Sequence, residues 1–353
     1  MVQTTNILPN LLDLARRSDP DGAISVIAET LSQCNQIITD MIWHEANLPT
    51  GHKVTLRTSL PQGTWRGLNQ GVASTKSNTM QVQFPIGELV DYAYVDKDLA
   101  DLNGNTEKWR LSEDMAHIEG LSQQMSTAVF YSNQLASQIG VTLPVGLAAI
   151  YNTTTGSAPI VKNTLTGGGA ASANASIWIA GWGDRTLYGI HPKGMPTGLQ
   201  YKNLGDVVPQ YDSNSLRFEA YTSMFKWWMG ITVEDWRYTV RIANLDTTTN
   251  AGGLFSTTPP DLNLLMIRAA KRLPEYTLRF NGITETDAPD EVQAGINPAI
   301  YMNRPVGEAF EIQAIRNKNV LLKMEEYAGM TIPTWRGVPI RNVDALLSTE
   351  SAI

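Results

Sequence analysis

Alternating hydrophobic and polar residues occur in two stretches between residues 53 and 86, on either side of a polar, glycine-containing segment. The positions on one face of these stretches are Val54, Leu56, Thr58, Met80, Val82, Phe84 and Ile86. A period of two is typical of strands, so this region predicts a long β-hairpin, with Gly63, Gly67 and Gly71 giving its tip conformational freedom. A lone two-stranded ribbon is marginally stable in water and has unpaired backbone groups at both edges. We therefore expect another copy of the chain to cover the ribbon, which makes assembly the first functional prediction.

Residues 1–47 are expected to form an N-terminal arm that carries helices. Asp19 followed by Pro20 is a typical N-cap and first-turn pair. After this pair, apolar residues recur every three or four positions to about residue 42, and these are Ile27, Leu31, Cys34, Ile38 and Met41. Such a helix needs a partner surface, either on its own chain or on a neighbour, and Cys34 is expected to be a small core residue.

A second periodic stretch predicts a long helix over residues 106–134. Its apolar side consists of Leu111, Met115, Ile118, Leu121, Met125 and Val129. At 1.5 Å per residue this gives about 40 Å of helix, long enough to be a structural spine. His117 falls beside the polar side and is expected to be solvated.

The rest of the chain mixes strand-like and helix-like stretches. Strands are expected at 89–95, 177–180, 186–190, 230–244 and 299–302, with a helix at 261–272 and a closing segment at 334–347. In the 230–244 strand, Trp236 and Tyr238 are expected on one face, and Arg237 and Arg241 on the other. No regular βαβα order is visible, so we predict an α+β fold.

Composition adds two open interpretations of the surface. Charged residues make up 17% of the chain, fewer than is usual for soluble domains, while there are 9 Trp and 12 Tyr. This combination fits either extensive protein–protein interfaces or a secreted β-rich protein with a neutral surface. The net charge of −7 argues against a dedicated nucleic-acid binder. With no apparent secretory signal and no apolar run of membrane-spanning length, we expect production in the cytoplasm and no membrane partner.

Catalytic and cofactor chemistry is weakly supported, and we predict no enzyme activity, no metal site and no cofactor. The four histidines are scattered, no Gly-x-Ser-x-Gly motif occurs, and the single cysteine excludes an intrachain disulfide. A calcium loop after Asp101 is disfavoured, because its glycine is two places early and Ser112 stands where a glutamate is needed. Adjacent carboxylates are solvated by default, although Glu234 and Asp235 could pair with Arg237 or Arg241 across a subunit junction. Lys53 and Lys76 could link covalently to an Asn of a neighbouring subunit. We prefer the interpretation that they are exposed charged residues that keep the edge of the sheet soluble.

The order of these parts resembles the major capsid proteins of tailed bacteriophages, with the Hong Kong 97-type shell fold. The segments that carry the closer, podovirus-like resemblance are Trp178-Ile-Ala-Gly-Trp-Gly183, Asp235-Trp-Arg-Tyr-Thr-Val-Arg-Ile-Ala-Asn244, Tyr301-Met-Asn-Arg304 and Trp335-Arg-Gly-Val-Pro-Ile340. The resemblance implies a shell subunit that forms hexamers and pentamers in an icosahedral virion enclosing double-stranded DNA, assembled in the host cytoplasm, with scaffolding, decoration and portal proteins as possible partners. The strand-rich block 177–244 precedes the lobe at 261–347, which suggests permuted connectivity relative to the commoner arrangement.

The expected parts are an arm (1–47), an extended β-hairpin loop (48–92), a peripheral domain with the spine helix (93–250) and an axial domain (251–353). The expected inter-subunit contacts are Lys53, Arg57, Trp65, Arg66, Lys76, Glu234, Arg237 and Arg241. Two alternatives stay open: a glycan-binding or carbohydrate-active protein that uses exposed tryptophans at 178, 182, 227 and 228, and a phage tail structural protein.

Overall fold

The structure is a computed structural model that describes residues 33–102, 106–132, 143–154, 163–169, 172–204, 208–211, 217–274, 296–316, 322–327 and 330–353. In chain order its elements are α2 (Ile37–Asp40), β1 (Trp43–Glu45), β2 (Gly51–Ser59), β3 (Asn78–Pro85), β4 (Gly87–Asp96), α3 (Lys97–Asp101), α4 (Thr106–Tyr131), α5 (Leu147–Ile150), β5 (Thr164–Thr166), β6 (Asn174–Trp182), β7 (Leu187–His191), β8 (Leu199–Asn203), β9 (Val208–Tyr211), β10 (Arg217–Val233), the 3₁₀ turn η3 (Trp236–Tyr238), β11 (Thr239–Asp246), α6 (Leu262–Ala270), β12 (Asn297–Met302), α7 (Arg304–Arg316), β13 (Leu322–Tyr327), β14 (Met330–Trp335) and β15 (Val338–Asn342).

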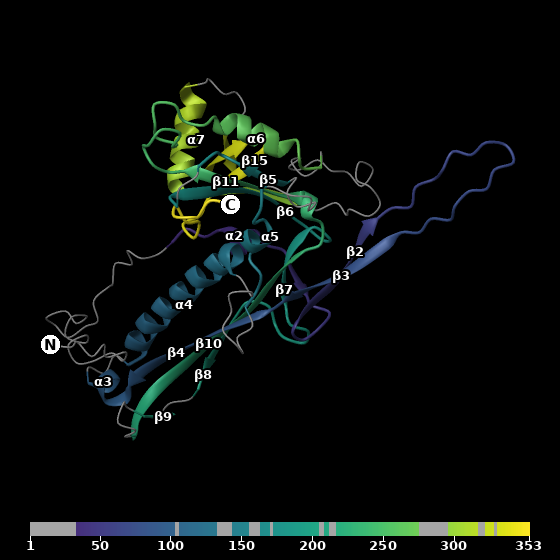
Figure 1. Cartoon of the computed structure of the whole chain (residues 1–353). Helices are drawn as coiled ribbons and strands as arrows, with labels where there is room; N and C mark the ends of the chain where they lie inside the picture. The colour runs from purple at the N-terminus through teal and green to yellow at the C-terminus, as the bar shows by residue number, and fades with distance from the viewer. Residues whose placement is uncertain are drawn as a thin grey trace.

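The molecule has three visibly different parts (Figure 1). A helical lobe contains α6, α7 and the strands beneath them, a platform contains α4 beside β4 and β10, and the β2–β3 ribbon projects away from both. One continuous sheet joins the first two parts, in the order β13-β14-β15-β12-β6-β7-β10-β4. The ribbon is a separate two-stranded sheet.

The centre of the helical lobe is β6, which is buried along its whole length. It pairs antiparallel with both β11 and β12. Its alternate side chains enter two different cores: Ile177 and Ile179 pack in the cluster that contains the buried faces of α6 and α7, whereas Trp178 and Trp182 pack in the main core. Burial on both faces explains why this segment is an almost continuous apolar run.

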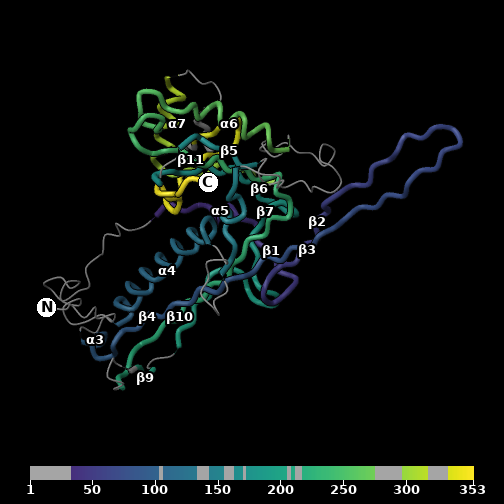
Figure 2. Tube along the Cα trace, viewed as in Figure 1, coloured from purple at the N-terminus to yellow at the C-terminus, as the bar shows by residue number. Residues whose placement is uncertain are grey.

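The platform is built on the antiparallel pair of β4 and β10, with α4 lying along it (Figure 2). Leu121 of α4 packs with Phe225 of β10, and Trp109 packs with Val95 of β4. Strands β8 and β9 also pair with β10. Beyond Met229, β10 leaves β4 and pairs with β7, which carries the platform into the sheet of the lobe.

The structure contains the expected hairpin and the expected long helix. The helix, α4, ends at Tyr131, because the next residue, Ser132, is not helical. Residues 133 and 134, to which the helix was expected to extend, and the arm up to residue 32 lie outside the described residues. The apolar side of α4 is covered only in its second half: Met125 and Val129 are buried, whereas Leu111 and Met115 are exposed.

Two sequence expectations are corrected by the structure. The single strand at 230–244 is wrong, because β10 ends at Val233 and a 3₁₀ turn separates it from β11; the Asp235 side chain accepts the Arg237 N–H and caps this turn. Cys34 is exposed rather than part of a core, since it precedes α2 in non-helical chain.

Candidate assembly interface

The hairpin is exposed from the end of β2 to the start of β3. Two large apolar side chains at its tip, Trp65 and Leu68, are 102% and 94% exposed. All four of its charged side chains, Lys53, Arg57, Arg66 and Lys76, are basic and exposed, and residues 51–86 contain no Asp or Glu. In the part of the chain that the structure describes, none of these four forms an ion pair. The hairpin is therefore a positively charged, partly apolar surface on a chain whose net charge is −7.

The root of the hairpin is held by the pairing of β2 with β3 and by one side chain of the preceding segment. The Asn47 amide donates to the Lys53 carbonyl (2.8 Å) and accepts from the Lys53 N–H (2.9 Å). Gly51 lies opposite Pro85, and a Cβ at Gly51 would lie 2.5 Å from the Phe84 carbonyl oxygen. This position therefore requires glycine for close approach of the two strands.

A polar cluster lies beside the root and includes one expected contact residue, Glu234. The Tyr188 hydroxyl donates to the Glu234 carboxylate (3.1 Å) and contacts Nε2 of His52 (3.3 Å). The Asn47 N–H donates to Nδ1 of His52. Burial lowers the pKa of His52, the nearby Glu234 carboxylate opposes this shift, and His44 adds to it. Burial, with Glu234 beside it, also raises the pKa of Tyr188.

The two remaining expected contact residues are engaged within the chain. Arg237 is exposed, and its guanidinium pairs with Asp235 in the same turn (2.6 Å). Arg241 is buried in the lobe, so it is not accessible to a neighbouring subunit. The alternation of residues 236–242 suggested that Arg241 faces outward, but β6 and β5 flank β11 on both sides and the helical lobe encloses it.

Arg241 is the centre of a buried hydrogen-bond network. Its guanidinium donates to the Glu350 carboxylate (2.9 Å), the Ser176 hydroxyl (3.1 Å) and the Tyr151 carbonyl (2.7 Å). Glu350 also accepts from the hydroxyls of Ser176 and Tyr131. Burial and the Glu350 carboxylate raise the pKa of Tyr131. The sequence gives no direct signal for this cluster, because its members lie far apart in the chain.

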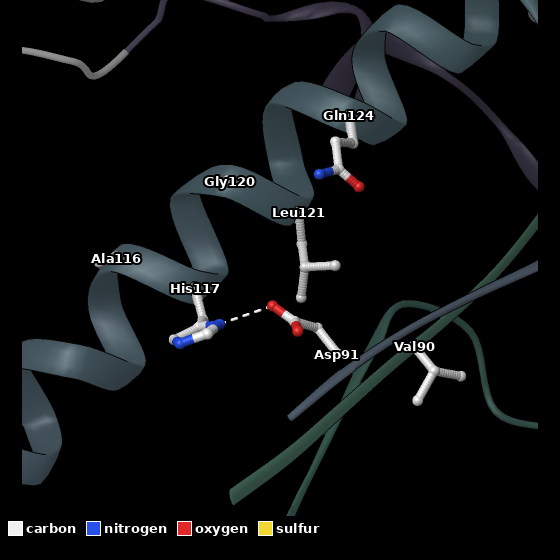
Figure 3. A pocket seen from close by; sticks show the side chains of 7 residues that line it. All are labelled: Val90, Asp91, Ala116, His117, Gly120, Leu121 and Gln124. Carbon is white, nitrogen blue, oxygen red and sulfur yellow. Dashed lines mark hydrogen bonds and ion pairs between the residues drawn. The ribbon is translucent and has the colours of Figure 1, made fainter. Parts of the chain in front are cut away.

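Between α4 and β4 lies a cavity of about 340 Å³ (Figure 3). His117 points across it toward Asp91, and its Nδ1 lies 2.6 Å from the carboxylate. His117 is therefore paired, not simply solvated as expected. Its ring also stacks on Phe225, so this pair helps to hold the helix on the sheet.

The described residues offer little for small-molecule chemistry. They contain no group of three or more His, Cys, Asp or Glu side chains that could hold a metal ion. No described helix is both long and apolar enough to cross a membrane. The tryptophans on which a glycan site depended are mostly internal, because Trp178 and Trp182 are fully buried and Trp227 is nearly so.

Comparison with known proteins decides the family. The family model described as major capsid protein GP7 matches residues 19–353. The chain belongs to this family.

One solved structure agrees with the GP7 assignment at high coverage. A chain in the near-atomic cryo-EM structure of bacteriophage epsilon15 is 32% identical, with 100% of this chain and 99% of that chain covered and a TM-score of 0.72. Weaker similarity is found to the SrpI encapsulin of Synechococcus elongatus PCC 7942 (10% identity, 68% and 96% covered, TM-score 0.40) and to the capsid of Myoviridae phage XM1 (10%, 63% and 96%, 0.39). The comparison with curated proteins finds no match.

These findings confirm the resemblance drawn from the sequence, together with its mixed helix-and-sheet fold of the Hong Kong 97 type. The GP7-family chain is a phage major capsid protein, a structural component of the virion that assembles with copies of itself into the capsid shell. The glycan-binding and tail-protein alternatives are not favoured.

Proposed function

We propose that the β2–β3 hairpin is the clasp by which each subunit binds its neighbour in the shell. The observation that carries this proposal is the combination of exposed Trp65 and Leu68 with four exposed basic side chains on a ribbon that contacts its own body only at the root. Aromatic and arginine side chains are the residues that most often dominate protein–protein interfaces.

The partner surface is expected to be acidic and partly apolar. A basic ribbon on an acidic chain is attracted to the remainder of an identical subunit, and this attraction orients the encounter. Lys53, Arg57, Trp65, Arg66 and Lys76 are therefore the inter-subunit contacts that we retain. Glu234 is retained indirectly, because it holds Tyr188 beside the root. Arg237 is a rim contact at most, and Arg241 belongs to the interior.

The same proposal covers the assembly as a whole. One chain forms hexamers and pentamers of an icosahedral shell, assembled in the host cytoplasm, that encloses double-stranded DNA without sequence-specific binding. Residues 93–250 and 251–353 provide its peripheral and axial regions, although both contribute strands to one sheet. Scaffolding, decoration and portal proteins are its expected partners, and its role requires no enzymatic step.

Deletion of residues 62–77 tests the clasp. The tip makes no contribution to the buried core, so the variant should remain soluble and melt like the parent while failing to form stable shells in gradient sedimentation and negative-stain microscopy. Normal particles from this deletion would refute the clasp.

A charge variant tests the electrostatic part separately. The double substitution Arg66→Glu and Lys76→Glu should reduce shell yield strongly at low salt, because it reverses the charge of an exposed tip. Lys193→Glu, at an exposed site outside the hairpin, is the control and should assemble normally. Equal yields from both variants would show that the charge of the hairpin is irrelevant to assembly.

A further inference from the structure

Helix α6 has one face that the described residues leave uncovered. The helix lies next to α7 on the helical lobe, where the Leu262 N–H of α6 donates to the Gln313 side chain of α7 (2.9 Å) (Figure 1). After the N-cap, the exposed residues of α6 and its C-cap are Leu264, Arg268 and Lys271. Their spacings of four and three place them on a single side of the helix, which we call the α6 face.

Helix α7 has an uncovered face with the same spacing. Its exposed residues include Glu308, Glu311 and Ile315, which follow one another at spacings of three and four and form the α7 face. Arg304, one turn earlier, is already paired within the chain. Arg316 is also exposed, but it lies about 100° around the helix from Ile315. The α7 face is therefore acidic, with one large apolar side chain that is 79% exposed.

The charges on the two faces are not neutralised by the described residues. Among these residues, none forms an ion pair with the two bases of the α6 face or with the two acids of the α7 face. Positive charge accumulates at the end of α6, where burial and the Arg268 guanidinium lower the pKa of Arg272. The α6 face is therefore basic, and it too carries one large apolar side chain, Leu264, which is 53% exposed.

The two faces complement each other when they are read in opposite directions. From Leu264, the two bases follow four and then three residues later; from Ile315, the two acids come four and then three residues earlier. In an antiparallel contact the opposing pairs are Leu264 with Ile315, Arg268 with Glu311, and Lys271 with Glu308. Each face is about 10 Å long. A parallel contact would instead place Leu264 opposite a glutamate, so the antiparallel contact is the one that matches at every position.

We propose that the α6 face of one subunit docks antiparallel on the α7 face of the next subunit in a ring. The inference rests on the proposed assembly into hexamers and pentamers, and it names the surfaces that meet within them. The occupant of each face is a second copy of this chain, because the charge and spacing of the two faces match. A contact between two different faces is head-to-tail, which is the kind of contact that generates closed rings.

Charge reversal on each face tests the contact. Arg268→Glu with Lys271→Glu makes both faces acidic, and Glu308→Lys with Glu311→Lys makes both faces basic. Because all four side chains are exposed, both variants should fold and melt like the parent. Like charges then meet in the contact, so shell yield at low salt should fall about tenfold or more. Normal assembly of either variant would leave the faces free for a different protein and would overturn the proposal.

Two comparisons make this test specific. Lys108→Glu with Lys193→Glu changes the net charge by the same amount as the α6 variant, at exposed sites outside the lobe, and should assemble like the parent. The hairpin is unchanged in all of these variants. A parent that forms no rings would therefore refute the proposed function, whereas a parent and lobe variants that form rings equally well would refute only this inference.

Combining the two charge-reversed variants gives the sharpest measurement. With all four substitutions in one chain, opposite charges meet again, and closed shells should return. In a 1:1 mixture of the two variants, opposite charges meet only where the variants alternate, and an alternating ring closes only with an even number of subunits. The mixture should therefore form hexamers but neither pentamers nor closed shells in sedimentation velocity and negative-stain microscopy. A fourfold variant that assembles no better than its parts would overturn the proposal.

Disulfide formation tests the direction of the contact. In a Cys34→Ser background, Leu264→Cys with Ile315→Cys should link assembled subunits on mild oxidation into a ladder that ends at the ring size on a non-reducing gel, because disulfides require Cα atoms within about 7 Å. Leu264→Cys with Glu308→Cys, which corresponds to a parallel contact, is the matched control and should stay monomeric. Only monomers from the first pair, or an equal ladder from the control, would contradict the antiparallel contact.

Discussion

Removing the Glu350 carboxylate should destabilise the subunit strongly. The side chains of Arg241 and Glu350 are 4% and 5% exposed, so Glu350→Ala would leave a buried guanidinium without its counter-charge. It would also leave the hydroxyls of Tyr131 and Ser176 without their acceptor. Breaking a buried ion pair by removing one partner costs about 3–5 kcal/mol.

The size of the effect can be converted to a melting temperature. With an unfolding entropy of about 2.1 cal/mol/K per residue, a loss of 3–5 kcal/mol lowers Tm by about 4–7 °C for a chain of this length. Differential scanning calorimetry of unassembled subunits is the assay. Glu311→Gln on the exposed face of α7 is the control and should change the free energy of unfolding by no more than about 0.5 kcal/mol.

A double variant tests whether the uncompensated charge of Arg241 causes the loss of stability. Replacing both members of a buried pair removes the uncompensated charge. The combination of Glu350→Ala with Arg241→Met should therefore destabilise the subunit by less than the sum of the two single changes. If Glu350→Ala melts within 1 °C of the parent, or if the double variant is fully additive, then the ion pair does not stabilise the lobe as described.

Three further predictions concern the hairpin root and the core. Because burial lowers the pKa of His52 in the folded chain, the contribution of His52 to stability is fully present above about pH 6.5 and is lost as the pH falls below that value. The protection factors of the amides at the root, which divide the intrinsic exchange rate at each pH by the observed rate, should therefore fall between pH 7 and pH 5, and constant protection factors would exclude this histidine. Gly51→Ala should lower the free energy of opening of the hairpin root by about 1–3 kcal/mol, because the added Cβ would meet the Phe84 carbonyl. Unchanged hydrogen exchange at the root would contradict this prediction. Trp178→Ala should lower the free energy of unfolding, measured by chemical denaturation, by about 3–5 kcal/mol. Trp236→Ala should lower it clearly less, because that side chain is only partly buried. A larger loss for Trp236→Ala than for Trp178→Ala would contradict the assignment of Trp178 to the core.

The parts of the fold that could be predicted are those in which apolar residues recur at a regular spacing. The hairpin, α4 and β6 each carry an uninterrupted apolar pattern, and local period is a reliable sign of the type of element. The pattern failed at residues 230–244, where a run that reads as one strand is interrupted by a turn. The signal for the interruption was local: Asp235 precedes Trp236, and aspartate side chains often cap such turns.

Contacts between distant residues could not be derived from the sequence. Arg241 looked like an outward-facing residue because its partner, Glu350, lies more than 100 residues away. Cys34 looked like a core residue because its spacing matched that of Ile38, although the described helix begins only at Ile37. The basic character of the hairpin, in contrast, was readable from the sequence, since residues 51–86 contain four basic residues and no acidic one.

Strand β10 has a mechanical consequence for the shell. One unbroken backbone of 17 residues pairs with β4 up to Met229 and with β7 from Gly230 onward. Covalent bonds therefore carry a load from the platform into the lobe, in addition to the side-chain packing of α4 in the main core. At the crossover point there is no room for a side chain, because a Cβ at Gly230 would lie 2.8 Å from the Pro85 carbonyl oxygen. The hairpin root meets the strand there, so a pull on the clasp and a twist of the platform act on the same point of the subunit.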